Sequence, residues 1–321
     1  MKRFLFAAAI VTSATLSLAA IARADSPAPD VAKAEALYNK GQFKESLTIL
    51  GAYLAQHPKD ATALVDRGDD YEALGDSKSA VADYSAAIAV NPDYAYAYAS
   101  RCDSRDELGQ HAEAVDDCDK AIALDPKMAY AYRARARAHL NLNDLPAALA
   151  DANNAIADNS DNAYGYEIRC RVYVDTGDLD KAVTDCNEAI RIDPAIEEGY
   201  YQRGRAEIGQ KKWDAAIADF TKAETIDPGP NGNYWLALAR LNSGDYATGL
   251  KDVNAYIAAK ADDGDGYYVL AQLQLKLGHT AEAKTAAQDA LKHYRIDNDQ
   301  AGAQKAQTLI DSMTAKPGGT H

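Results

Sequence analysis

A 34-residue period runs through most of this 321-residue chain and constrains its fold more than any other feature. Prolines lie at positions 58, 92, 126, 194 and 228, and each interval between them is 34 residues or a multiple of 34. Glycine and alanine recur with the same period, as at Gly75 and Gly109 or at Ala80 and Ala114. A fixed period of this length indicates stacked structural repeats rather than one globular core.

Each repeat is predicted to contain two short helices. A glycine such as Gly75 suits the left-handed end of the first helix, and an aspartate that follows, Asp76 or Asp178, is expected to cap the second. The proline after the second helix prevents its continuation, and the small alanines let the two helix axes approach closely. Because neither helix is long enough to be stable alone, neighbouring repeats must supply the core.

The residues of one repeat resemble a unit of the tetratricopeptide repeat family: Gly68, Tyr71, Gly75, Ala80, Tyr84, Ala87 and Pro92. The resemblance extends from about residue 30 to residue 295 and implies an all-α, right-handed superhelical solenoid of about eight units. We expect this solenoid over residues 25–296, followed by a capping helix and a loose tail over 297–321. The seventh unit is one residue short at Pro228-Gly229-Pro230.

The N-terminal segment that ends at Ala24 has the features of a secretory signal peptide. It carries three basic residues and no acid, and a long apolar stretch ends at Ala22-Arg23-Ala24, just before Asp25. We therefore expect cleavage after Ala24 and export, to a bacterial periplasm or beyond the cell; an uncleaved anchor is the alternative. After cleavage no membrane insertion is expected, because positions 25–321 contain no apolar run that approaches the roughly 18 residues of a membrane span.

Charge and motifs exclude several function classes. The formal net charge of −14 disfavours nucleic acid and anionic bilayers as partners, since both select basic surfaces. The six histidines form no paired metal-binding spacing, and there is no nucleophile elbow or phosphate-binding glycine loop. We accordingly expect no enzymatic activity, no catalytic residues, no metal and no cofactor.

An arginine recurs once per repeat, and an aspartate follows each of these arginines at position i+16. The pairs are Arg67 with Asp83, Arg101 with Asp117, Arg135 with Asp151, Arg169 with Asp185, and Arg203 with Asp219. The seventh repeat has Asp252, but Leu236 takes the place of its arginine. We interpret the pairs as ion pairs between the two helices of one repeat, because a partly buried arginine without an acid is costly. A ladder of arginines that binds a ligand is the alternative.

The four cysteines occupy the next position along the same register. Cys102 and Cys118 belong to the third repeat and Cys170 and Cys186 to the fifth, and in each repeat the second cysteine is again at position i+16. In an oxidising compartment we expect the disulfides Cys102–Cys118 and Cys170–Cys186, because the other connectivities would join repeats too far apart. Buried reduced thiols are the alternative.

The resemblance also implies where a partner binds, because the first helix of each tetratricopeptide unit lines a concave groove. The candidate groove residues are Arg133, Arg137, Leu140, Arg171, Val174, Tyr201, Arg205, Ile208 and Trp235. Arginine and aromatic side chains beside apolar surface are typical of binding hot spots. The alternative is that the arginines pair with neighbours such as Glu167 and Asp175 and that the aromatic rings only pack between repeats. An acidic stretch is expected to orient the partner by repulsion; it consists of Asp66, Asp69, Asp103 and Asp106.

These features together predict an exported, non-catalytic scaffold that binds a protein or peptide in its concave groove. A structural adaptor in an envelope assembly, acting through its convex face or its ends, is the alternative. The sequence specifies neither the partner nor the oligomeric state.

Overall fold

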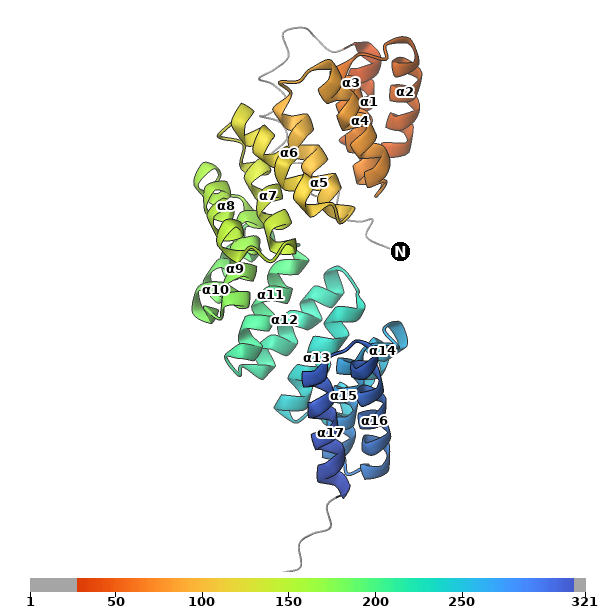
Figure 1. Ribbon diagram of the computed structural model, residues 1–321. Helices are drawn as coiled ribbons and strands as arrows, with labels where there is room; N and C mark the ends of the chain where they lie inside the picture. Colours follow the sequence, from red (N-terminus) through yellow and green to blue (C-terminus); the bar gives the residue numbers. More distant parts are fainter. Residues whose placement is uncertain (1–27, 315–321) are drawn as a thin grey trace, which may run out of the picture. The chain divides into compact units, whose positions relative to one another are not determined.

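The computed structural model describes residues 28–314, and this part of the chain contains seventeen α-helices and no strand (Figure 1). Sixteen of the helices form eight consecutive pairs, and one further helix follows them. The all-α repeat architecture predicted from the sequence is therefore confirmed. The expected signal peptide and the end of the expected tail lie outside the described residues.

The helices follow the 34-residue period. The first nine are α1 (Pro29–Tyr38), α2 (Phe43–Gln56), α3 (Ala61–Ala73), α4 (Ser77–Val90), α5 (Ala95–Glu107), α6 (His111–Leu124), α7 (Ala129–Asn141), α8 (Leu145–Asp158) and α9 (Ala163–Thr176). The others are α10 (Leu179–Ile192), α11 (Glu197–Gly209), α12 (Trp213–Ile226), α13 (Pro230–Ser243), α14 (Tyr246–Ala259), α15 (Gly264–Lys276), α16 (Thr280–Ile296) and α17 (Gln300–Thr314). None of them is long and apolar enough to cross a bilayer.

The chain forms two compact units, one ending at Val172 and one beginning at Tyr173, so that the boundary falls within α9. In the first unit, α3 packs on α4 and α5 on α6, and the second helices α2, α4 and α6 also pack on the first helix that follows each of them. The first helices α1, α3, α5 and α7 contact one another in sequence order and form one layer. We call the surface built by the first helices of a unit its first-helix face.

The turns between paired helices need a left-handed residue, usually glycine. Gly75 has φ +77°, whereas Asn143 and Lys211 adopt φ of about +60° at the corresponding turns. Asp76 caps α4 by accepting a hydrogen bond from the Ser79 amide at 3.2 Å. The same prediction for Asp178 is wrong, because its carboxylate makes no capping bond and instead accepts from the Lys181 ammonium at 2.9 Å.

One position on the first helix of a repeat packs against one position on the second helix, and the side chains at these two positions are complementary in size. A Cβ atom at Gly68 would lie 2.5 Å from the Tyr84 ring, and one at Gly204 would lie 2.8 Å from the Phe220 ring. Two small, fully buried alanines hold the same positions in the fourth repeat, Ala136 and Ala152. The interior therefore accepts a glycine–aromatic pair or two small residues, but not an independent change at one position.

In the third repeat these two positions hold Cys102 and Cys118, which form a disulfide with an S–S distance of 2.03 Å. This is the pairing that the sequence register predicts, and it joins α5 to α6. Over residues 28–314 no cysteine is free, Cys170 and Cys186 included. The oxidation state of the four cysteines in exported protein stays a prediction.

Candidate interaction surface

Four of the five predicted arginine–aspartate pairs are present within single units. The shortest nitrogen–oxygen distances are 2.6 Å for Arg67–Asp83, 2.6 Å for Arg101–Asp117, 2.7 Å for Arg135–Asp151 and 2.6 Å for Arg203–Asp219. The four aspartates are buried, so these arginines hold the two helices of a repeat together. Arg169 and Asp185 belong to different units, and their pairing stays a prediction.

Arginines of the predicted ion pairs also reach back to the preceding repeat, a contact that was not predicted from the sequence. Each of four arginines donates to a polar side chain 16 residues earlier: Arg101 to Ser85, Arg135 to Asp119, Arg169 to Asn153 and Arg203 to Asn187. Each also lies over the tyrosine three residues before it, as Arg135 does over Tyr132 at 5.7 Å. The polar residue recurs two positions after each ladder aspartate, which was the signal available in the sequence.

The seventh repeat keeps its ion pair by another route. Arg240, one helical turn after Leu236, donates to Asp252. The corresponding position holds Arg105 in the third repeat, which also pairs with its ladder aspartate, at 2.6 Å. The sixth repeat has Glu207 there, and burial together with the nearby Asp219 raises the pKa of Glu207 above its ordinary value.

The replacement Asp151→Ala is expected to lower the free energy of unfolding by roughly 1–3 kcal/mol, because the half-buried Arg135 loses the buried carboxylate with which it pairs. Arg135 keeps one acid, since Asp119 also accepts from it, so the lower half of this range is expected. The matched control Asp119→Ala removes a 56% exposed carboxylate and should cost less than about 0.5 kcal/mol. In urea unfolding, Arg135→Ala combined with Asp151→Ala should cost less than the two single changes added; strict additivity would show that they are not partners.

On the first-helix face of the first unit, Arg137 is already neutralised. Its guanidinium lies 2.6 Å from Asp103 and 2.8 Å from Asp106, and Arg133 approaches Asp103 at 3.4 Å. Burial alone would raise the pKa of Asp103, but Arg137 and Arg133 lower it below its ordinary value. The two acids come from the preceding repeat, so Arg137 matches the alternative in which the groove arginines pair with neighbours.

In the second unit Arg205 is also engaged. It donates to Asp175 at 3.0 Å and to Gln202 at 2.9 Å, and it lies over the Trp235 ring at 5.5 Å. Trp235 in turn stacks on Phe220 with ring centroids 6.0 Å apart and meets Tyr201 edge to face. These rings form one packed cluster with Arg205 above it.

The aliphatic candidate groove residues, Leu140, Val174 and Ile208, are at most partly exposed. Leu140 is 7% exposed and lies in the core with Ile168 and Val172, so its prediction as a groove residue is wrong. The helix phase explains this, because Leu140 faces the second helix of its own repeat, at Ala148 and Ala152. Ile208 packs on the Phe220 cluster and Val174 is half-buried.

Arg171 differs from the candidate groove arginines Arg137 and Arg205. It is half-buried on α9, and the described residues give it neither a hydrogen bond nor an ion pair. The sequence explains the difference: Arg137 uses acids 34 and 31 residues before it, whereas the residues at those spacings from Arg171 are Arg137 itself and Leu140.

The opposite charge prevails at the start of the first unit. Asp69 on α3 accepts hydrogen bonds from the hydroxyls of Tyr84, at 2.7 Å, and Tyr96, at 3.3 Å. Glu72, one turn along α3, accepts from Ser104. We call this region the acid–tyrosine surface; it consists of Tyr38, Asp69, Glu72, Tyr84, Tyr96, Ser100 and Tyr130.

Burial raises the pKa of Asp69 to about 7, and it raises the pKa of the neighbouring Asp70 to about 7 as well. Burial and the charge of Asp103 raise the pKa of Glu72. None of these three carboxyl groups takes part in an ion pair with a Lys, Arg or His of residues 28–314. Burial therefore raises these pKa values without a nearby cation to lower them again.

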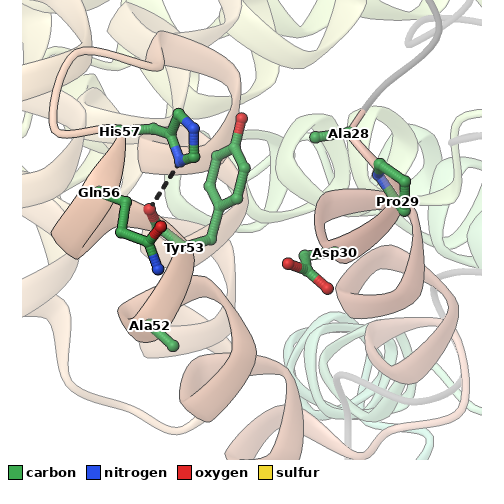
Figure 2. A pocket seen from close by; sticks show the side chains of 7 residues that line it. All are labelled: Ala28, Pro29, Asp30, Ala52, Tyr53, Gln56 and His57. Atoms are coloured by element: carbon green, nitrogen blue, oxygen red, sulfur yellow. Dashed lines mark hydrogen bonds between the residues drawn. The ribbon is translucent and has the colours of Figure 1, made fainter.

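An open pocket of about 320 Å³ lies between α1 and α2, lined by Ala28, Pro29, Asp30, Ala52, Tyr53, Gln56 and His57 (Figure 2). The His57 ring stacks on Tyr53 with centroids 4.3 Å apart, and the Tyr53 hydroxyl donates to Asp60 at 2.9 Å. These contacts give Tyr53 and His57 structural roles. Across residues 28–314, no three His, Cys, Asp or Glu side chains are placed to hold a metal ion.

Family profiles identify the repeats directly. A tetratricopeptide repeat profile matches residues 65–129, 133–195 and 200–265, and a second one matches residues 264–293. These segments cover more than half of the sequence, so the chain belongs to the tetratricopeptide repeat family. No curated protein matches it.

Solved structures share the fold at low sequence identity. One is from the crystal structure of the APC/C hetero-tetramer Cut9–Hcn1 (TM-score 0.72, 14% identity, 89% of this chain and 55% of that one). Another is a tetratricopeptide repeat protein from Parabacteroides merdae (0.54, 15%, 79% and 99%), and a third is Pseudomonas aeruginosa pilF (0.57, 17%, 67% and 96%). This chain thus spans about half the length of the first, and all three likenesses concern the fold alone.

Proposed function

We propose that this protein is an exported, non-catalytic scaffold that holds an extended segment of a partner protein on its first-helix face. The observation that carries the proposal is Arg171, a half-buried cation to which the described residues give no partner. A carboxylate from a bound segment would form charge-assisted hydrogen bonds with it, and membership of a family that generally binds proteins or peptides supports the same reading.

The alternative is a structural adaptor that acts through other faces. Arg137 and Arg205 favour neither reading, because intramolecular acids already neutralise them. The two readings differ at Arg171, whose replacement weakens binding only if the first-helix face is used.

Peptides selected from a random display library on residues 25–321 are expected to lose about tenfold in affinity when Arg171 is replaced by alanine, which corresponds to the loss of one charge-assisted contact. The matched control is Lys120→Ala, an exposed cation on the second helix α6 of the same unit, and it should change affinity less than about twofold. Fluorescence anisotropy gives both values. Peptides that bind the Arg171→Ala variant undiminished would favour the adaptor.

Export belongs to the same proposal and has a separate test. The segment before Asp25 has the charge, apolar stretch and small-residue tripeptide of a cleavable signal. Protein recovered from the exported compartment should begin at Asp25. An intact Met1 in that compartment would instead support an uncleaved anchor.

A further inference from the structure

We propose that the acid–tyrosine surface of the first unit binds a cationic side chain, a lysine or arginine in a basic segment of the partner. This inference rests on the proposed function and adds the chemistry of the partner. It is confined to α1, α3, α4, α5 and α7, which belong to one compact unit.

The first argument is the distribution of charge on this face. Its acids fall into two groups. Asp103 and Asp106 are matched by Arg133 and Arg137 at 2.6–3.4 Å. Asp69 and Glu72 receive only hydroxyl donors, from tyrosine and serine. A hydroxyl does not neutralise a carboxylate, so the second group is the one that a ligand cation would complete.

The second argument is a buried polar atom with no partner. Ser100 is 2% exposed, and its hydroxyl makes no hydrogen bond of good geometry. Ser100 lies one turn after Tyr96 on α5. Its hydroxyl partly counteracts the rise in the pKa values of Tyr96 and Tyr130 that burial causes, so it lies beside both tyrosine hydroxyls. An uncommitted acceptor among hydroxyls and carboxylates suits an N–H donor from a bound ammonium or guanidinium.

The third argument is the aromatic surroundings. The rings of Tyr96 and Tyr130 lie 5.9 Å apart, and Arg133 already occupies the space over Tyr130 at 4.9 Å. The same unit therefore holds one cation between a tyrosine ring and an acid, Asp103. Tyrosine faces next to a carboxylate attract a second cation by the same physics.

Ligand binding is expected to release protons near neutral pH. The groups that face Asp69 and Glu72 are acids or hydroxyls: Tyr38 from α1, Tyr84 from α4, Tyr96, Ser104, Asp103 and Glu107 from α5, Tyr130 from α7, and Asp66 and Asp70 from α3 itself. Asp70 faces Ser46 from α2. A ligand cation favours the ionised carboxylates and lowers their pKa, so that affinity should rise by about tenfold from pH 6 to pH 8.5.

The test uses calorimetric titration of residues 25–321 with an acetylated and amidated peptide in which lysine alternates with serine. A glutamate–serine peptide is the comparison. The variant Asp69→Asn with Glu72→Gln should bind the lysine peptide about tenfold more weakly and should lose the pH dependence. The matched control is Glu113→Gln with Asp116→Asn, two exposed acids on α6 of the same unit, which removes the same charge and should cost less than about twofold.

Equal losses in the two variants would overturn the inference, since they would show that only net charge matters. Equal binding of the glutamate peptide, or no binding of the lysine peptide at pH 8.5, would overturn it too. If library-selected peptides still depend on Arg171 in that case, the proposed function stands without this site. Circular dichroism of each variant shows whether its helices are intact.

Discussion

A variant with alanine in place of both Cys102 and Cys118 is expected to lose about 3 kcal/mol of unfolding free energy relative to the oxidised protein. The disulfide closes a loop with a sequence separation of 16, and opening it restores that chain entropy to the unfolded state. The packing should survive, because the fourth repeat holds two buried alanines, Ala136 and Ala152, at the same positions.

Urea unfolding with and without reductant provides the measurement. The comparison is made in a background that carries Cys170→Ala and Cys186→Ala, so that Cys102–Cys118 is the only disulfide that a reductant can open. In that background the reduced protein should approach the stability of the variant that also lacks Cys102 and Cys118, and a reductant should leave the stability of that variant unchanged. Non-reducing peptide mapping of exported protein should recover Cys102 with Cys118 and Cys170 with Cys186. Four free thiols in that material would contradict the disulfide prediction.

The helical pairs and their boundaries were predictable because they depend on local residue types that recur. Gly75 ends a helix, Ala80 and Ala87 lie in the core, and each helix after them ends before the repeat's proline. Eight copies in one chain allow accidental residues to be separated from required ones. The Asp178 cap failed because a neighbouring lysine competes for its carboxylate, and a repeat average does not contain that exception.

The ion pairs between the two helices of a repeat were predictable wherever the aspartate follows the arginine at position i+16. Ion pairs whose partner lies one helical turn away or in another repeat were not predicted. Arg240 replaces Leu236 as the partner of Asp252 from one turn along the helix. Arg135 also reaches Asp119 in the preceding repeat. Side-chain reach in three dimensions decides the contact of Arg240, whereas the polar residue two positions after each paired aspartate was a periodic signal for the contact of Arg135.

The candidate surface was the least predictable feature. The sequence grouped Asp69 and Asp103 in one repulsive stretch, but Arg137 reaches back to Asp103 and leaves Asp69 without a cation. The tyrosine hydroxyls on Asp69 come from a second helix and from the next repeat. The contact of Tyr96 with Asp69 recurs one repeat later as Tyr130 with Asp103, so a separation of 27 residues was a periodic signal for it. Leu140 was assigned to the wrong face because its spacing from the repeated arginines was read as a groove position, whereas its side chain packs on Ala148 and Ala152 of the paired helix.

Asp70→Ala is expected to stabilise the protein at pH 8 by about 2 kcal/mol and to have little effect at pH 4. Asp70 is fully buried between α3 and α2, and neither carboxyl oxygen has a hydrogen-bond partner at good geometry. Burial first, then the charge of Asp69, raises its folded-state pKa from 3.8 to about 7. The fourth and sixth repeats carry alanine there, Ala138 and Ala206, so the smaller side chain fits this packing.

The sign follows from proton binding. Between about pH 4 and pH 7 the folded chain holds a proton on Asp70 that the unfolded chain has lost, so stability falls as pH rises through this window. Thermal melts at pH 4 and pH 8 should show a gain for Asp70→Ala only at pH 8, whereas the control Asp116→Ala, an exposed acid on α6, should change little at either pH. A loss at pH 8, or the same gain at both values, would contradict the assignment. A gain in stability for Asp70→Ala at pH 8 would mean that Asp70 destabilises the folded protein at that pH. A destabilising acid next to Asp69 and Glu72 is expected where a binding surface is retained at the expense of stability.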